Sequence, residues 1–253
     1  MIPKIKLLLN TIINIKNPLI YYKDFFGLID KNATYLLKLK NKLLITLRAN
    51  TPDRGIFNEI FYYKFYNPKN FEIYNNDTIV DVGAHIGLFG LYATSCAKNV
   101  KVYCFEPSII NYQLLNKNIM NNNLQLIKTF NLAVNNSNKK EKLYLDNSND
   151  SHGFYSKSID NQFTTVNCIS LEKIIENNKI KKINLLKMDC EGCEYNILYN
   201  LPNKIFEIIE KIVFEVHIKK SNHDPDNLIK FLSKKGYKVN KKEWIIYAKK
   251  IKQ

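Results

Sequence analysis

The stretch of residues 78–107 constrains the fold more than any other part of the chain. A β-branched run at 78–82 leads into a glycine turn, a helical segment follows, and a second apolar run ends at Glu106. Continuous apolar runs are typical of buried parallel strands, and a tight glycine turn into a helix continues such a strand as a β-α-β unit. Ligands of these sheets bind beyond the carboxyl ends of the strands, where Asp81, Gly83 and Glu106 fall.

The glycine spacing indicates the kind of nucleotide. A dinucleotide loop reads G-x-G-x-x-G, and its second glycine lets the backbone approach a pyrophosphate. Here Gly83 and Gly87 make G-x-x-x-G, and the side chain of His85 would crowd a pyrophosphate. The pattern suits S-adenosylmethionine (SAM), which has a ribose but no diphosphate, and a carboxylate at Glu106 can accept both ribose hydroxyls. The alternative is a generic α/β sheet with a structural glycine turn.

We expect the SAM site to lie at the ends of neighbouring strands and in the loops that follow them. Its candidate residues are Asp81, Gly83, Ala84, His85, Gly87, Glu106, Pro107, Asn131, Leu132 and Asp189. Asn131 follows the predicted third strand, residues 126–130, where a short polar side chain can read the adenine. The alternative for Asn131 is a plain turn asparagine.

A second polar cluster follows the predicted fourth strand, residues 183–188. Residues 189–194 read Asp-Cys-Glu-Gly-Cys-Glu, and carboxylates this close raise one another's pKa unless they are exposed or a cation lies nearby. Glu215 and His217 end the next predicted strand. Because side chains alternate along a strand, these two lie on the same side of it.

This cluster suits methyl transfer to a hydroxyl. An alcohol is a poor nucleophile until a base takes its proton or a metal ion weakens it. His217 is the preferred base because its ordinary pKa lies near neutrality. Asp189, Glu191 and Glu215 are further catalytic candidates, and Asp189, Glu215 and His217 are possible ligands of Mg²⁺ or Mn²⁺. The competing interpretation is a helix N-terminus that favours acids, with His217 in a capping or core position.

The five cysteines, an odd number, argue against a disulfide framework. Cys190 and Cys193 form a single CxxC, which is half a zinc site with His217 and His223, or a redox pair. We favour neither, because no second CxxC is present and the flanking acids raise a thiol's pKa.

The net charge of +15 allows a polyanion as partner. The lysines are scattered, however, and the acids at the strand ends would repel phosphates. The Asn/Asp-Pro-Pro-aromatic motif of base-amino methylases is absent at residues 189–192. We expect a small-molecule or glycan acceptor and no stable nucleic-acid complex, with a nucleic-acid methyltransferase as the alternative.

Residues 1–30 are mixed apolar and basic and predict two short helices separated before Pro18. We expect them to pack on the domain, with contact to a membrane surface as the alternative. Residues 35–47 predict a hairpin. No apolar run is long enough to span a membrane, and no secretory signal is visible, so we expect a cytoplasmic protein.

The expected organisation is an extension over residues 1–50 followed by one α/β domain over 51–253. Within that domain, residues 135–169 read as an inserted loop and hairpin, with strands at 142–145 and 163–168 and the intervening part as a lid near the site. Residues 239–248 predict a closing antiparallel pair at the sheet edge.

Together these residues resemble the FkbM family of SAM-dependent methyltransferases, from about residue 53 to the C-terminus. The motifs that carry the resemblance are D-x-x-x-F-x-E-I-F at 53–61, I-V-D-V-G-A-H-I-G at 79–87, F-E-P at 105–107, L-L-K-M-D-C-E-G-C-E at 185–194, F-E-V-H at 214–217 and G-Y at 236–237. The block at 185–194 is the most specific, whereas many methyltransferases share the glycine loop.

The resemblance implies a Rossmann-like class I methyltransferase fold, a doubly wound and mostly parallel α/β sheet with an antiparallel C-terminal hairpin. It also implies O-methylation of a hydroxyl on a sugar, glycan or small metabolite. The family usually has Asn in place of His85, and small apolar residues in place of Cys190 and Cys193, so these cysteines look incidental. A module that holds SAM without chemistry is a third hypothesis, which the acids at both strand ends argue against.

Overall fold

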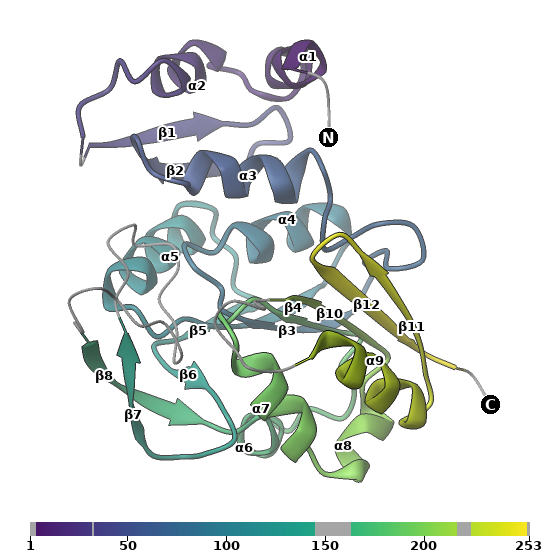
Figure 1. Cartoon of the computed structure of the whole chain (residues 1–253). Coiled ribbons are helices and arrows are strands. Elements are labelled where there is room, and N and C mark those ends of the chain that lie inside the picture. Colours follow the sequence, from purple (N-terminus) through teal and green to yellow (C-terminus); the bar gives the residue numbers. More distant parts are fainter. Residues whose placement is uncertain (1–3, 32, 145–162, 217–223, 252–253) are drawn as a thin grey trace.

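The computed structural model describes residues 4–31, 33–144, 163–216 and 224–251. In this part of the chain, a seven-stranded sheet forms the centre of the molecule (Figure 1). In sheet order its strands are β11 (Tyr237–Lys242), β12 (Ile245–Lys250), β10 (Lys211–Glu215), β9 (Leu185–Met188), β3 (Thr78–Val82), β4 (Lys101–Phe105) and β5 (Ile127–Phe130). The strands from β10 to β5 are parallel, and β12 pairs antiparallel with β10. The predicted fold class is confirmed.

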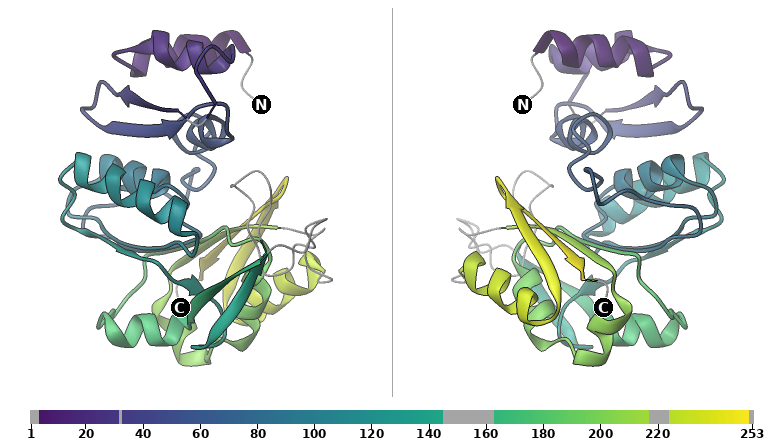
Figure 2. Two further views of the ribbon diagram at one scale, coloured as in Figure 1. Left: turned by 90° about the vertical axis from the view of Figure 1, so that its left-hand side faces the viewer. Right: turned by 90° about the vertical axis from the view of Figure 1, so that its right-hand side faces the viewer.

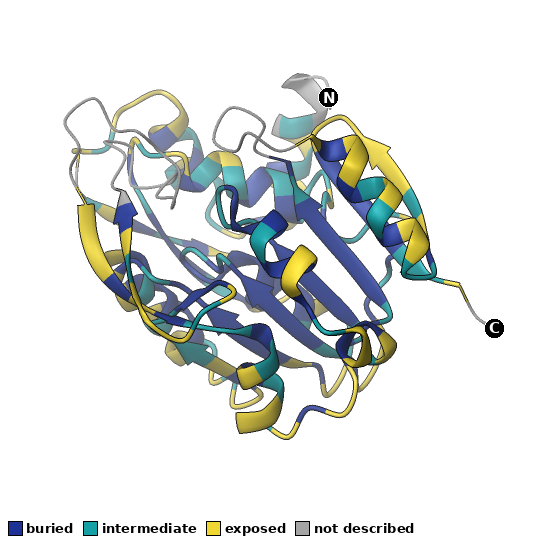
Figure 3. Ribbon diagram, turned by 60° about the horizontal axis from the view of Figure 1, so that its bottom comes forward, coloured by how far each residue is buried: buried dark blue, intermediate teal, exposed yellow. Residues whose placement is uncertain are grey.

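The central strands are mostly apolar because both faces of the sheet are covered. Side chains alternate between two apolar clusters, with Ile79 and Leu185 in the first and Val80 and Leu186 in the second. The first lies under α3 (Asp53–Phe61), α4 (Leu88–Cys96) and α5 (Ile109–Asn121), and the second under α6 (Leu171–Asn177), α7 (Cys193–Asn200), α8 (Asn203–Ile208) and α9 (Pro225–Lys234). Figure 3 shows the central strands buried, whereas the edge strand β11 and the outer helix faces carry exposed residues.

The strand order fixes where a ligand can bind. From β3 the chain continues to β4 and β5 on one side, and then returns to β9 and β10 on the other. In open α/β sheets, ligands bind at such a switch point, in the crevice outside the carboxyl ends of the strands. Here that crevice lies above β3, between the loops that follow β4 and β9.

The N-terminal segment packs onto the domain as expected. Helices α1 (Lys4–Asn14) and α2 (Pro18–Phe25) lie outside a hairpin of β1 (Thr34–Lys38) and β2 (Leu44–Arg48), as Figures 1 and 2 show. One edge of β2 pairs with no strand of the described chain, and its backbone is hydrogen-bonded by an amide side chain of α5. Asn118 accepts from the Thr46 N–H at 2.7 Å and donates back to its carbonyl at 3.2 Å. Side-chain amides thereby replace a neighbouring strand, which ties the hairpin to the domain.

A small sheet stands beside the central one. It contains β6 (Ala133–Val134), β7 (Lys140–Tyr144) and β8 (Phe163–Ile169), and β7 pairs antiparallel with β8. The predicted hairpin between 142–145 and 163–168 is therefore present. The predicted lid between its strands falls largely on residues 145–162, which lie outside the described residues.

Candidate active site

A cavity of about 230 Å³ lies at the carboxyl ends of β3, β4, β9 and β10. Predicted site residues from all four strand ends line it, namely Gly83, Ala84, His85, Glu106, Pro107, Asp189, Glu191 and Glu215. The glycine loop and both predicted acidic ends therefore meet at one place, as expected for a switch point.

Four predicted cofactor residues are not among the described residues that line this cavity: Asp81, Gly87, Asn131 and Leu132. Gly87 begins α4 with a φ of 84°, and Leu132 packs against the second apolar cluster. Asn131 donates its side-chain amide to the carbonyls of Glu106 and Pro107, both at 2.9 Å. Asn131 thus braces the loop after β4. Its predicted contact with the adenine stays a prediction. His217 lies outside the described residues, so its predicted role as base stays a prediction.

Asp81 lies at the carboxyl end of β3, as expected, and is fully buried beneath the glycine loop. Its Oδ1 lies 3.0 Å from Nζ of Lys187, its register partner on β9. Nζ of Lys187 also donates to the Gly83 carbonyl at 2.8 Å. Burial lowers the pKa of Lys187, but Asp81 and Asp189 more than offset this and keep the ammonium charged. Asp81 therefore positions the loop through Lys187.

Position 83 requires glycine for two reasons, its positive φ and the close approach of another backbone segment. Its φ is 73°, and a Cβ at this position would lie 1.9 Å from the carbonyl oxygen of Asp189. No side chain can be accommodated against a rigid backbone atom at that distance. The loops that follow β3 and β9 consequently touch at this glycine, which brings Asp189 to the glycine loop.

Glu106 is held rigidly in the cavity wall and is 5% exposed. Its carboxylate accepts the N–H groups of His85 at 2.8 Å and Ser108 at 2.9 Å, and the side-chain amide of Asn111 at 3.5 Å. Burial nevertheless raises the pKa of Glu106 to about 7. A carboxylate has about four acceptor sites, and the short bonds from His85 and Ser108 occupy two of them. The contact from Asn111 is long, at 3.5 Å, so a ligand that displaces it can take the remaining two sites. Two ribose hydroxyls would supply those bonds, so the residues present fit SAM.

The N-terminal hairpin reaches the same wall through Arg48. This guanidinium forms a two-pronged pair with Asp53, at 2.9 and 2.7 Å, and donates to Oδ1 of Asn111. Its Nη2 also lies 2.8 Å from Nε2 of His85. Because a guanidinium cannot accept a hydrogen bond, Nε2 accepts this one, and in the neutral ring the proton is then on Nδ1. The sequence reasoning missed Arg48, which lies outside the motifs.

The other end of the cavity is its acidic end, where carboxylates lie near Tyr66. The Tyr66 hydroxyl donates to Oδ2 of Asp189 at 3.1 Å. Burial, followed by the charges of Asp189, Glu215 and Glu59, raises the pKa of Tyr66 well above its usual value. Burial and the nearby Asp189 also raise the pKa of Glu59 to about 7. A cavity-lining carboxyl with that pKa is a candidate base, which the sequence reasoning did not single out.

Within the described residues, no group of three or more His, Cys, Asp and Glu side chains is placed to hold a metal ion. The proposed set of Asp189, Glu215 and His217 is not tested by this finding, because His217 lies outside those residues.

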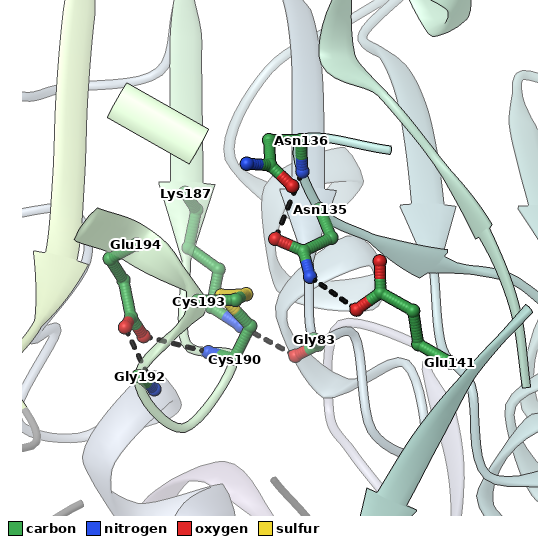
Figure 4. The surroundings of a disulfide bond; sticks show 9 residues. All are labelled: Gly83, Asn135, Asn136, Glu141, Lys187, Cys190, Gly192, Cys193 and Glu194. Carbon is green, nitrogen blue, oxygen red and sulfur yellow. Dashed lines mark hydrogen bonds between the residues drawn. A yellow bond between two sulfur atoms is a disulfide. The ribbon is translucent and has the colours of Figure 1, made fainter. Parts of the chain in front are cut away.

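Cys190 and Cys193, interpreted from the sequence as incidental, are joined by a disulfide (Figure 4). The bond closes the turn between β9 and α7. The buried Glu194 carboxylate holds the same turn by accepting the N–H groups of Cys190 at 3.0 Å and Gly192 at 2.9 Å. The disulfide and two hydrogen bonds therefore both hold this turn, directly beside Asp189.

Comparison with known proteins agrees with this geometry. Residues 81–239, more than half of the chain, match the family model for the methyltransferase FkbM domain. The chain belongs to the FkbM methyltransferase family. This FkbM protein is thus a SAM-dependent methyltransferase, and the predicted family, enzyme class and SAM cofactor are confirmed.

Two relatives and one solved structure show how similar this chain is to known methyltransferases. Methyltransferase sdnD of Sordaria araneosa is 25% identical over 191 residues, 63% of this chain and 73% of that protein. Hexuronic acid methyltransferase AglP of Haloferax volcanii is 25% identical over 163 residues, 64% of each chain. A putative rRNA-methylase from Clostridium thermocellum is 11% identical, covers 82% of this chain and 99% of its own, and has a TM-score of 0.45. We draw no functional argument from that low structural similarity.

Proposed function

We propose that this FkbM enzyme transfers the methyl group of SAM to a hydroxyl of a sugar, glycan or small hydroxylated metabolite. The acidic end of the cavity is the observation that carries the proposal. Glu59, Asp189 and Glu215 lie near Tyr66 at this end, and Glu191 also lines the cavity. Carboxylates accept hydrogen bonds from hydroxyl groups, and they repel the phosphates of a nucleic acid. The relative AglP, named as a hexuronic acid methyltransferase, supports a sugar acceptor.

Three parts of the chain would hold the cofactor. Glu106 would accept the ribose hydroxyls, and the loop at Gly83 would pass beside the amino-acid end. The apolar wall of Ala133, Val134 and Leu143 would cover the adenine. When bound, SAM supplies the methyl group and a positive sulfonium. Asp189, beside the Gly83 loop, would offset that charge.

The acceptor hydroxyl would lie at the acidic end, where Glu59 takes its proton. A carboxyl with a pKa of about 7 is half ionised at neutral pH and can accept a proton and later release it to water. Asp189 is held by Tyr66 and would orient the same hydroxyl. His217 remains the second candidate base, from the sequence alone, and a Mg²⁺ or Mn²⁺ requirement stays a prediction.

A methyl-transfer screen with radiolabelled SAM tests this proposal. The acceptors are hexuronic acids, neutral sugars, glycans, small hydroxylated metabolites and total RNA. We expect label in a hydroxylated small molecule or glycan, as an ether stable to mild base. Label in RNA alone would overturn the proposal in favour of the nucleic-acid alternative. Binding of SAM with no transfer to any acceptor, with or without Mg²⁺ or Mn²⁺, would favour the non-catalytic module.

A further inference from the structure

The two N-terminal helices and the turn after α2 present apolar side chains that nothing in the described chain covers. Of the sixteen large hydrophobic residues exposed in the described part of the chain, seven fall within residues 9–28. Leu19 is 75% exposed, Phe26 66% and Leu28 71%, and Leu9, Ile12 and Ile13 are each more than half exposed. Helices α1 and α2 form the outermost layer at one end of the molecule (Figures 1 and 2). Large apolar side chains that are exposed together on one outer layer indicate an interaction site.

These exposed residues are not needed to hold the helices in place, because other residues do that. Ile15 pairs with Leu39 and is buried. Asn17 bonds to the backbone of β1 through both ends of its amide. Asp24 accepts the Tyr35 hydroxyl at 3.0 Å. The helices are therefore anchored by one side, and the outward side is available to a partner.

The charges around this face select the kind of partner. Residues 1–50 carry eight lysines and one arginine but only two aspartates. One of those aspartates, Asp24, is buried against Arg54. Lys16 and Lys23 are exposed on the linker and on α2. Lysines are depleted in protein interfaces but enriched beside the apolar face of helices that lie on anionic lipid.

The same helices are too short to cross a bilayer. Helix α1 has 11 residues, a length of roughly 16 Å against a hydrocarbon core of about 30 Å. No helix in the described part of the chain has the length and apolar character of a membrane span. Contact with lipid through this face must therefore be superficial.

We propose that α1 and α2 dock this enzyme on an anionic lipid bilayer. Leu19, Phe26 and Leu28 enter the head-group region, and Lys16 and Lys23 contact lipid phosphates. This inference is independent of the acceptor, because it concerns a surface remote from the cavity.

Co-sedimentation of the full chain with vesicles tests it. The vesicles contain phosphatidylcholine alone or with 30% phosphatidylglycerol, a probe composition of about one-third anionic lipid chosen to give a negative surface potential. We expect binding to the anionic vesicles that weakens as salt rises. Leu19→Ser/Phe26→Ser/Leu28→Ser should lower the partition coefficient about tenfold or more. Met120→Ser, at a residue 74% exposed on α5, is the matched control and should bind like the wild type.

A second variant tests the charge. Lys16→Glu/Lys23→Glu should lower binding to anionic vesicles at least about tenfold, whereas Lys181→Glu, at another exposed lysine, should lower it far less. Unchanged thermal melting shows that each variant folds. Absence of wild-type binding, or equal binding by the apolar variant, would overturn the proposal. So would a wild-type dimer in ultracentrifugation that the apolar variant dissociates, because the face would then be a contact between two copies.

Discussion

Replacing Lys187 by methionine tests the charge pair beneath the cofactor loop. The side chains of Lys187 and Asp81 are almost completely inaccessible, and their charged atoms lie 3.0 Å apart. Methionine fills a similar volume but leaves the Asp81 carboxylate buried without its cation. Removing one partner of a buried pair lowers the free energy of unfolding by about 3–5 kcal/mol. We expect that loss for Lys187→Met, together with weaker SAM binding, because the Gly83 carbonyl loses its donor.

The double variant makes the test specific to the pair. Asp81→Asn alone leaves a buried ammonium and should also cost about 3 kcal/mol or more, whereas Asp81→Asn/Lys187→Met leaves no buried charge. Its loss should be about 3 kcal/mol smaller than the sum of the single losses. Lys211→Met is the control, since this buried lysine donates to the Glu72 carbonyl and should cost about 1–3 kcal/mol. Denaturant unfolding followed by circular dichroism measures all four. Additivity to within about 0.5 kcal/mol would refute the reasoning.

Four further predictions follow from the site. SAM affinity falls as the pH drops below about 7, because Glu106 then loses the charge that accepts the ribose hydroxyls; calorimetry between pH 8 and 5.5 measures this, and a flat profile contradicts it. Glu59→Gln keeps SAM affinity but lowers kcat about 100-fold or more, and the fall in kcat below about pH 7 disappears from its pH profile; full turnover in this variant would make His217 the base instead. Arg48→Lys weakens SAM binding several-fold, because one ammonium cannot hold His85 as the two-pronged guanidinium network does; unchanged calorimetric affinity refutes this. Cys190→Ala lowers stability by about 2 kcal/mol or less in denaturant unfolding and leaves SAM affinity nearly unchanged, since hydrogen bonds still hold the turn; loss of SAM binding shows that the disulfide is essential.

The sheet could be predicted because each strand carries its own local signal. The runs at 78–82, 101–105 and 183–188 are apolar and bounded by turns, and they appear in the structure as β3, β4 and β9 with shifts of at most two residues. The helix N-terminus that was the competing interpretation of residues 189–194 is present, because α7 begins at Cys193. Helix α8, which follows Pro202, was not predicted.

The site was predicted at its strand ends but not in its supporting contacts. Lys187 interrupts an apolar strand just as Asp81 does. Two opposite charges inside buried strands are expected to form an ion pair. The sequence therefore contained a signal for this pair, and the parallel pairing of β3 with β9 places the two residues opposite each other. Contacts between distant segments have no such signal. Arg48 meets His85 across 37 residues, and Tyr66 meets Asp189 across 123, so only the folded chain shows them.

Titration calorimetry of SAM against Glu106→Gln tests the central claim most directly. The claim is that the cofactor's ribose is held by this buried carboxylate at the end of β4. Two hydrogen bonds to a charged acceptor contribute about 3 kcal/mol or more, so Glu106→Gln should weaken SAM binding at pH 8 by about 100-fold or more. Glu176→Gln, at an exposed glutamate on α6, should bind SAM as the wild type does. Wild-type affinity in Glu106→Gln would contradict the account.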